Sequence, residues 1–117
     1  MRKNKRKKSY YFGVFSEFFV CAYLCLRFYT ILNLRYKTPS GEIDIVAKKG
    51  NHIIFVEVKA RKASANIADV LSYHQKQRIK RAADIFISRN PRFVTCNASF
   101  ELFAVWPFGV KRIRDAF

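Results

Sequence analysis

Two short stretches in the middle of the chain carry acids and a lysine at spacings that could do chemistry: Glu42, Asp44, Glu57 and Lys59. Both stretches, 41–47 and 53–59, are rich in β-branched residues, and Gly50-Asn51 between them is typical of a tight β-hairpin turn. If Gly50 and Asn51 are the two turn residues, opposed residue numbers sum to 101, so Asp44 faces Glu57 and Glu42 faces Lys59. Because side chains alternate along a strand, Asp44, Glu57 and Lys59 then share one face of the hairpin.

The two faces of this hairpin differ in chemistry. One is wholly apolar and is expected to face the core, with Ile43, Ile45, Ala47, Ile54, Val56 and Val58. The charged face also carries Val46, Ile53 and Phe55, so another element should cover it and partly bury the acids. Opposed like charges destabilise a sheet, and burial adds to this, so Asp44 and Glu57 need a cation between them. Lys59 can be that cation, or a metal ion can, and Mg²⁺ (or Mn²⁺) suits two carboxylates with room for water and phosphate.

The alternative is that the four residues form only a cross-strand salt network on an exposed sheet edge, where ion pairs are common and weak. The scarcity of acidic residues in the chain argues against this alternative. The chain has 8 Asp and Glu against 23 Lys and Arg, for a net charge of +15, yet three of those acids lie on these two strands. So basic a chain favours a polyanion, either nucleic acid or an anionic membrane, as its partner.

The elements around the hairpin predict one α/β domain. A length of 117 residues, half of them hydrophobic, is enough for a single core. Apolar residues recur at helical spacing over 12–28 and 66–89, and Asn90-Pro91 ends the second helix. Further strands are expected at 30–35, 100–106 and 110–114, with a weaker strand pattern at 93–95. The order α-β-β-β-α-β, followed by the last short strand, predicts a mixed β-sheet flanked by helices.

The N-terminus is strongly basic, so residues 1–9 are expected to form a disordered tail before a domain at 10–117. This segment and the apolar residues 18–26 imitate a secretory signal, but no small-x-small cleavage site follows. The apolar run is also much shorter than the ~20 residues of a spanning helix, and Glu17 precedes it. We expect a core helix, although a basic segment beside an apolar helix could also bind a membrane surface.

Three cysteines, Cys21, Cys25 and Cys96, show neither a CxxC motif nor paired zinc spacing. We expect them to be reduced and mostly buried in a cytoplasmic protein.

The Asp…Glu-x-Lys pattern on a hairpin resembles the PD-(D/E)xK nuclease superfamily, and further motifs are similar to its small YraN family, related to archaeal Holliday-junction resolvases. These motifs are Gly13-x-x-x-Glu17, Gly41-Glu42-Ile43-Asp44, Phe55-Val56-Glu57-Val58-Lys59-Ala60-Arg61 and Ile113-Arg114-Asp115-Ala116-Phe117. The resemblance implies a restriction-endonuclease-like core and a Mg²⁺-dependent, structure-selective DNA endonuclease. It implies that Asp44, Glu57 and the Val58 carbonyl hold the metal, and that Glu17 adds a carboxylate. Lys59 would then stabilise charge on the phosphate or orient the attacking water.

Two motifs depart from the family pattern. The Lys-Gln pair of the second helix appears as His74-Gln75-Lys76-Gln77. Gln75 lies four residues before the apolar Ile79 and shares its inward face, so we favour Gln75 over Gln77 as the site residue. The Arg-Phe-Asp of the late strand appears as Ser99-Phe100-Glu101, which keeps only the acid. These changes favour the alternative function, a non-catalytic nucleic-acid-binding module that retains the nuclease fold.

Basic residues at both ends of the hairpin and along the second helix could frame the acids. Such residues hold phosphates without reading bases, so they favour recognition of shape, for instance in branched DNA. A solvated helix face is the alternative for any one of them. The family resemblance also implies a homodimer. The candidate nucleic-acid-binding residues are Lys48, Lys49, Arg61, Lys62, Lys76, Arg78, Lys80 and Arg81.

Overall fold

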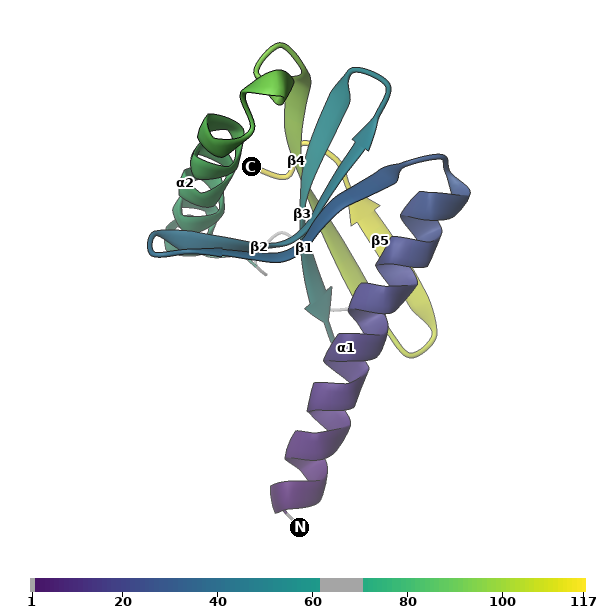
Figure 1. Cartoon of the computed structure of the whole chain (residues 1–117). Coiled ribbons are helices and arrows are strands. Elements are labelled where there is room, and N and C mark those ends of the chain that lie inside the picture. Colours follow the sequence, from purple (N-terminus) through teal and green to yellow (C-terminus); the bar gives the residue numbers. More distant parts are fainter. Residues whose placement is uncertain (1, 62–70) are drawn as a thin grey trace.

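The computed structural model describes residues 2–61 and 71–117, without the side chains of residues 2–10. Five strands form one sheet in the order β1-β2-β3-β4-β5, in which only the β3–β4 pair is parallel. This confirms the predicted α/β class with a mixed sheet (Figure 1). The elements are α1 (Arg2–Leu26), β1 (Thr30–Thr38), β2 (Gly41–Lys49), β3 (His52–Ala60), α2 (Tyr73–Arg89), the 3-10 turn η2 (Pro91–Phe93), β4 (Asn97–Trp106) and β5 (Gly109–Ile113).

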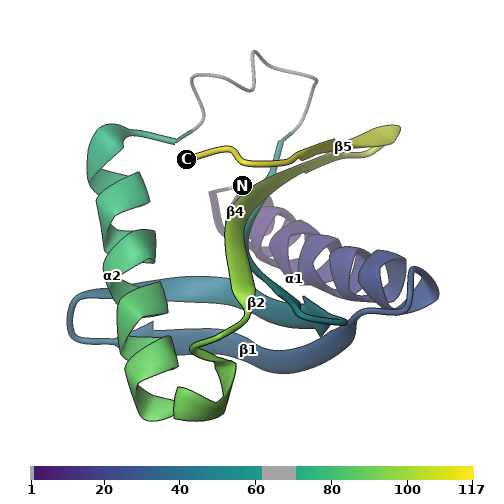
Figure 2. The same ribbon diagram turned by 90° about the horizontal axis from the view of Figure 1, so that it is seen from above.

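The two helices cover opposite faces of the sheet, as Figure 2 shows. On one face, Val20 and Leu24 of α1 are fully buried in a cluster with β2, β3 and β4. On the other face, α2 buries a second cluster. The α2 cluster includes Val46, Ile53 and Phe55, so α2 is the cover that the charged face of the hairpin was expected to have.

The hairpin has the predicted register over the half nearest its turn. Five pairs, from Lys49–His52 to Ile45–Val56, have residue numbers that sum to 101. The ladder ends at Ile45–Val56, and β2 then follows β1 toward α2 while β3 continues in its own direction (Figure 1). The predicted pairings of Asp44 with Glu57 and of Glu42 with Lys59 are therefore not ladder pairs. The two strands instead separate at the acids.

One residue of the predicted apolar face lies on the other side. Ile43 belongs to the α2 cluster with Val46, whereas Ile45 belongs to the α1 cluster. The alternation is interrupted where β1 is irregular: Arg35, opposite Asp44 in the β1–β2 register, has a positive φ of 50°. Such a backbone is uncommon for a residue other than glycine and locally turns the strand.

Two predicted helix starts and one predicted strand were wrong. Helix α1 begins at Arg2 rather than residue 12, so residues 2–9, expected to be disordered, are helical. Helix α2 begins at Tyr73, because Ser72 and Gln75 form a reciprocal capping box, and residues 66–70 of the predicted helix lie outside the described residues. The weak strand pattern at 93–95 is not a strand, because Pro91 starts a 3-10 turn that stacks Phe93 on Phe86.

The three cysteines are free thiols, but Cys25 is exposed and the other two are only partly buried, so the expected burial was wrong for Cys25. In the part of the chain that the structure describes, no helix is long and apolar enough to cross a membrane.

Candidate active site

The separation of β2 from β3 places the Asp44 side chain where a backbone acceptor would otherwise be. An Asp44 carboxylate oxygen accepts a hydrogen bond of 2.8 Å from the Val58 backbone N–H, two residues beyond the last ladder pair. An N–H left unpaired there would be unfavourable, so this bond fixes the carboxylate at the opening. The Asp44 and Glu57 carboxyl groups are close enough that each shifts the pKa of the other.

Both carboxyl groups are pushed toward their neutral forms. Burial is the largest cause that raises the pKa of Asp44 to about 7, and the charge of Glu57 adds to it, while the Val58 N–H acts in the opposite direction. Burial also raises the pKa of Glu57, and Lys59 opposes that shift. Two adjacent buried carboxylates are ionised together only if a cation accompanies them. The pair therefore has the electrostatics of a cation-binding site.

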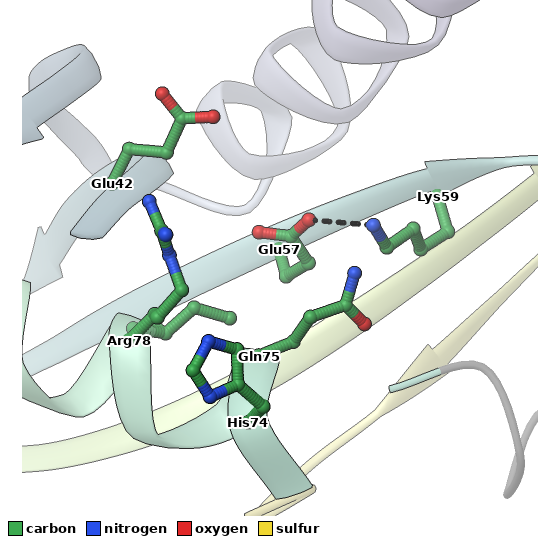
Figure 3. Close-up of a pocket in the computed structure, with 7 residues that line it drawn as sticks. Glu42, Glu57, Lys59, His74, Gln75 and Arg78 are labelled. Atoms are coloured by element: carbon green, nitrogen blue, oxygen red, sulfur yellow. Dashed lines mark ion pairs between the residues drawn. The ribbon is translucent and has the colours of Figure 1, made fainter. Parts of the chain in front are cut away.

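Lys59 supplies part of that positive charge. Its Nζ lies 3.1 Å from Glu57 Oε1, and the side chains of Lys59 and Glu57 are only 20% and 14% exposed (Figure 3). Lys59 is thus a cation beside the acid pair, as predicted, although its ion-pair partner is Glu57 and not Glu42, which the register placed opposite it. Glu42 is exposed and stands at the rim of the site.

A pocket of about 370 Å³ opens in front of these groups, between the separated strands and α2. In Figure 3 the Gln75 side chain extends toward Lys59 and Glu57, and Arg78 extends toward Glu42. Gln75 lines this pocket and Gln77 does not. His74 also lines it. The complete lining is Glu42, Glu57, Lys59, His74, Gln75, Arg78 and Ile79.

Gly41 determines how near α2 comes to these strands. A Cβ at position 41 would overlap the backbone carbonyl oxygen of Arg78. Only glycine therefore permits this approach, which carries Gln75 and Arg78 to the acids on β2 and β3. The close packing of α2 thus explains why the Gly41-Glu42-Ile43-Asp44 motif begins with glycine.

Glu17 reaches the site from the α1 side. It lines a second hollow of about 170 Å³ with Arg35, Lys37, Glu42, Ile43 and Asp44. Its carboxylate is 3.0 Å from Arg35 Nη2, and its charge contributes to the raised pKa of Asp44. Sequence reasoning missed Arg35. The β1–β2 register places Arg35 opposite Asp44 and could have identified it, had the turn at 39–40 been used to set that register.

The predicted nucleic-acid-binding residues are dispersed. Arg78 lines the pocket, and Arg61 follows β3 directly after Ala60. Lys48 and Lys49 lie at the opposite end of the hairpin from Asp44 and Glu57. Lys76, Lys80 and Arg81 are on α2, and Lys62 lies outside the described residues.

Glu101 does not line the pocket and has a structural partner. Its carboxylate is 3% exposed and accepts bonds of 2.6 and 3.1 Å from Arg112, whose guanidinium also donates to Tyr29. The acid retained from the late-strand motif therefore joins β4 to β5.

Among the residues described, no three His, Cys, Asp or Glu side chains form a group that could hold a metal ion unaided. Mg²⁺ does not require three, because it commonly binds one or two carboxylates and completes its shell with water and phosphate oxygens. Asp44, Glu57 and the carbonyl of Val58 are all hard oxygen donors, and the excess negative charge of the pair fits such an ion.

Comparison with known proteins points to one family. The model of the uncharacterised protein family UPF0102, also called YraN, matches residues 16–105. The chain is 39% identical over 106 residues to a UPF0102 protein of Agrobacterium fabrum, covering 91% of this chain and 87% of that one. It is 35% identical to one of Bartonella quintana (100% and 96% covered) and 40% identical to one of Rhizobium etli (96% and 93% covered).

Proposed function

The chain belongs to the UPF0102 family, as its motifs suggested, and we propose that it is a metal-dependent endonuclease that hydrolyses phosphodiester bonds in branched or otherwise structured DNA. One observation carries the proposal. Two partly buried carboxyl groups, Asp44 and Glu57, lie together where β2 and β3 separate: Glu57 pairs with Lys59 at the wall of an open pocket, and Asp44 lines the adjoining smaller hollow. Such a cluster of perturbed acids in a hollow is typical of a catalytic site.

Asp44, Glu57 and the Val58 carbonyl would hold Mg²⁺ or Mn²⁺, and Glu17 would add negative charge from the α1 side. A bound divalent ion supplies a water of lowered pKa and a counter-charge for the phosphate. The Val58 N–H keeps the Asp44 carboxylate oriented for this role, since it occupies one oxygen of that carboxylate. Because the pKa of Asp44 is raised to about 7, binding of the ion near neutral pH displaces a proton.

The remaining pocket residues act on the phosphate and the water. The Lys59 ammonium group can stabilise charge that develops on a non-bridging phosphate oxygen. Arg78 can hold a neighbouring phosphate, and the Gln75 amide can orient the attacking water or the phosphate. The net charge of +15 raises the local concentration of nucleic acid. We also propose that the protein acts in the cytoplasm. We propose further that it acts as a homodimer, because a DNA junction offers two cleavage sites.

The first experiment is a titration of the pure protein with Mg²⁺ and Mn²⁺, using supercoiled plasmid and a labelled four-way junction. We expect metal-dependent cleavage that prefers the junction. Asp44→Asn and Glu57→Gln should each lower the rate by about 100-fold or more, since each removes a metal ligand. Asp44→Asn should still bind the junction at least as tightly, because a negative charge near the phosphate is lost.

Asp84→Asn is the matched control, because Asp84 is exposed on α2 and does not line the pocket. It should cleave like the parent. Cleavage that survives both Asp44→Asn and Glu57→Gln would refute the assignment of the site.

A second candidate function, a non-catalytic DNA-binding module, is favoured by the existing ion pairs. Lys59 already lies beside Glu57, and Arg35 lies beside Glu17, so these acids are partly neutralised without a metal. Such a module would bind the junction in a salt-dependent manner that Mg²⁺ does not change, and the parent would cleave nothing.

A further inference from the structure

An apolar hollow next to the carboxylate site has no part in the chemistry above. It lies between α1 and β1, has a volume of about 340 Å³, and is lined by Val14, Glu17, Phe18, Cys21, Leu34 and Arg35. Phe18 is 66% exposed and Leu34 is 49% exposed. Large apolar side chains that face water around a concave surface are typical of a binding site.

The hollow adjoins the carboxylate site through two shared residues. Glu17 and Arg35 also line the polar hollow that contains Glu42 and Asp44. The two hollows are thus separated by a single ion pair, with 3.0 Å between Arg35 Nη2 and Glu17 Oε2. One ligand can therefore place a charged group beside Asp44 and a flat apolar group against Phe18.

A nucleotide has this combination of groups, and the charge of the chain selects for it. The net charge of +15 favours a polyanion over a neutral ligand. An exposed aromatic ring stacks on any base, because every base has a π-face. A base inside a duplex is covered on both faces by its neighbours, so only an unpaired or extruded base can reach such a ring.

We propose that Phe18 and this hollow bind one unpaired nucleobase next to the scissile phosphate. The inference rests on the proposed nuclease function and narrows its substrate to DNA with an unpaired or extruded base beside the cleaved bond, as in forks, flaps and junctions opened at their branch point. A second copy of the chain or a lipid surface would instead contact the broad outer face of α1, where Tyr11, Phe15 and Phe19 are also exposed.

The test compares Phe18→Ala with Phe15→Ala. Phe15 is a matched control, since it is 60% exposed on the same helix but does not line the hollow. Binding to a forked duplex with unpaired arms and to a blunt duplex of equal length is measured by fluorescence anisotropy in EDTA. Phe18→Ala should weaken binding to the fork about five- to 150-fold and change binding to the blunt duplex by less than about twofold. Phe15→Ala should change neither.

Equal losses for both variants on both DNAs would overturn the base site. So would a shift of both variants to a smaller species in sedimentation, or a loss of binding to phosphatidylserine vesicles by both. Cleavage with Mg²⁺, measured separately, distinguishes the two proposals. A parent that binds the fork through Phe18 but cleaves nothing refutes the nuclease and leaves the base site standing. A nuclease whose Phe18→Ala variant binds and cleaves the fork like the parent refutes only the base site.

Discussion

Replacing Asp44 by Asn should stabilise the folded protein at alkaline pH and have little effect near pH 4, because the Asp44 carboxyl group resists ionisation in the folded state. Burial beside Glu57 raises its pKa from 3.8 to about 7. A carboxyl group with a raised folded-state pKa contributes stability below its unfolded pKa, and this contribution disappears as the pH rises through about 7. Asn retains an oxygen that can accept the Val58 N–H bond, but it does not ionise.

The size of the effect follows from the shift. A change from 3.8 to about 7 corresponds to a free energy on the order of 4 kcal/mol. Part of this free energy belongs to the interaction between Asp44 and Glu57, because Glu57 ionises more easily once Asp44 is neutral. We therefore expect Asp44→Asn to raise the free energy of unfolding by about 2 to 4 kcal/mol at about pH 8.5. For a domain of this size, the corresponding increase in Tm is about 10 °C.

The assay is chemical unfolding of the parent, Asp44→Asn and the Asp84→Asn control across this pH range in EDTA. The gain of Asp44→Asn over the parent should rise from near zero at acid pH to its full value above pH 7, whereas Asp84→Asn should follow the parent. Adding Mg²⁺ at alkaline pH should stabilise the parent but not Asp44→Asn, because only the parent retains both ligands. Parallel pH curves for the parent and Asp44→Asn, or a variant that is less stable at every pH, would refute the inference that ionisation of Asp44 beside Glu57 destabilises the folded protein.

Two further substitutions test the scaffold that positions the site. Arg112→Met should lower the free energy of unfolding, measured by urea unfolding, by about 3 to 5 kcal/mol, because it leaves Glu101 buried and unpaired. Adding Glu101→Leu should recover much of this loss. A double variant as unstable as Arg112→Met would contradict this explanation. Gly41→Ala should cost about 1 to 3 kcal/mol and abolish junction cleavage, since the new methyl group forces α2 away at Arg78. Gly13→Ala, where no atom lies within 4 Å of the added Cβ, is the control and should be at least as stable as the parent.

The hairpin was predictable because its determinants are local. Gly50-Asn51 sets the turn, and Gly50 has the positive φ of 58° that such a turn needs. The two-residue turn fixes which residues are opposed, strict alternation fixes which share a face, and the five observed pairs have the predicted register. The capping box that starts α2 was also present in the sequence, as Ser72 followed three residues later by Gln75, and would have corrected the helix start.

The separation of β2 from β3 was not predictable in this way. A local rule continues the register to Asp44 and Glu57, whereas the structure ends it at Ile45–Val56. The causes lie elsewhere in the chain, in the positive φ of Arg35 on β1 and in the close approach of α2 at Gly41. Tertiary packing thus turned an expected cross-strand pair into two neighbouring carboxyl groups that line two adjoining hollows.

Two acidic sites in the described part of the chain show which kind of ion pair is structural and which can be functional. At Glu101 the carboxylate is almost inaccessible, and one guanidinium binds both of its oxygens, so no further ligand is needed. At the other site, Asp44 and Glu57 have one lysine beside them; Glu57 faces a pocket of about 370 Å³, and Asp44 lines an adjoining hollow of about 170 Å³. Burial without a full set of partners is unfavourable to the folded protein, and a divalent cation would relieve it. The same excess of negative charge that destabilises this end of the hairpin is therefore what would give the site its proposed affinity for a metal ion.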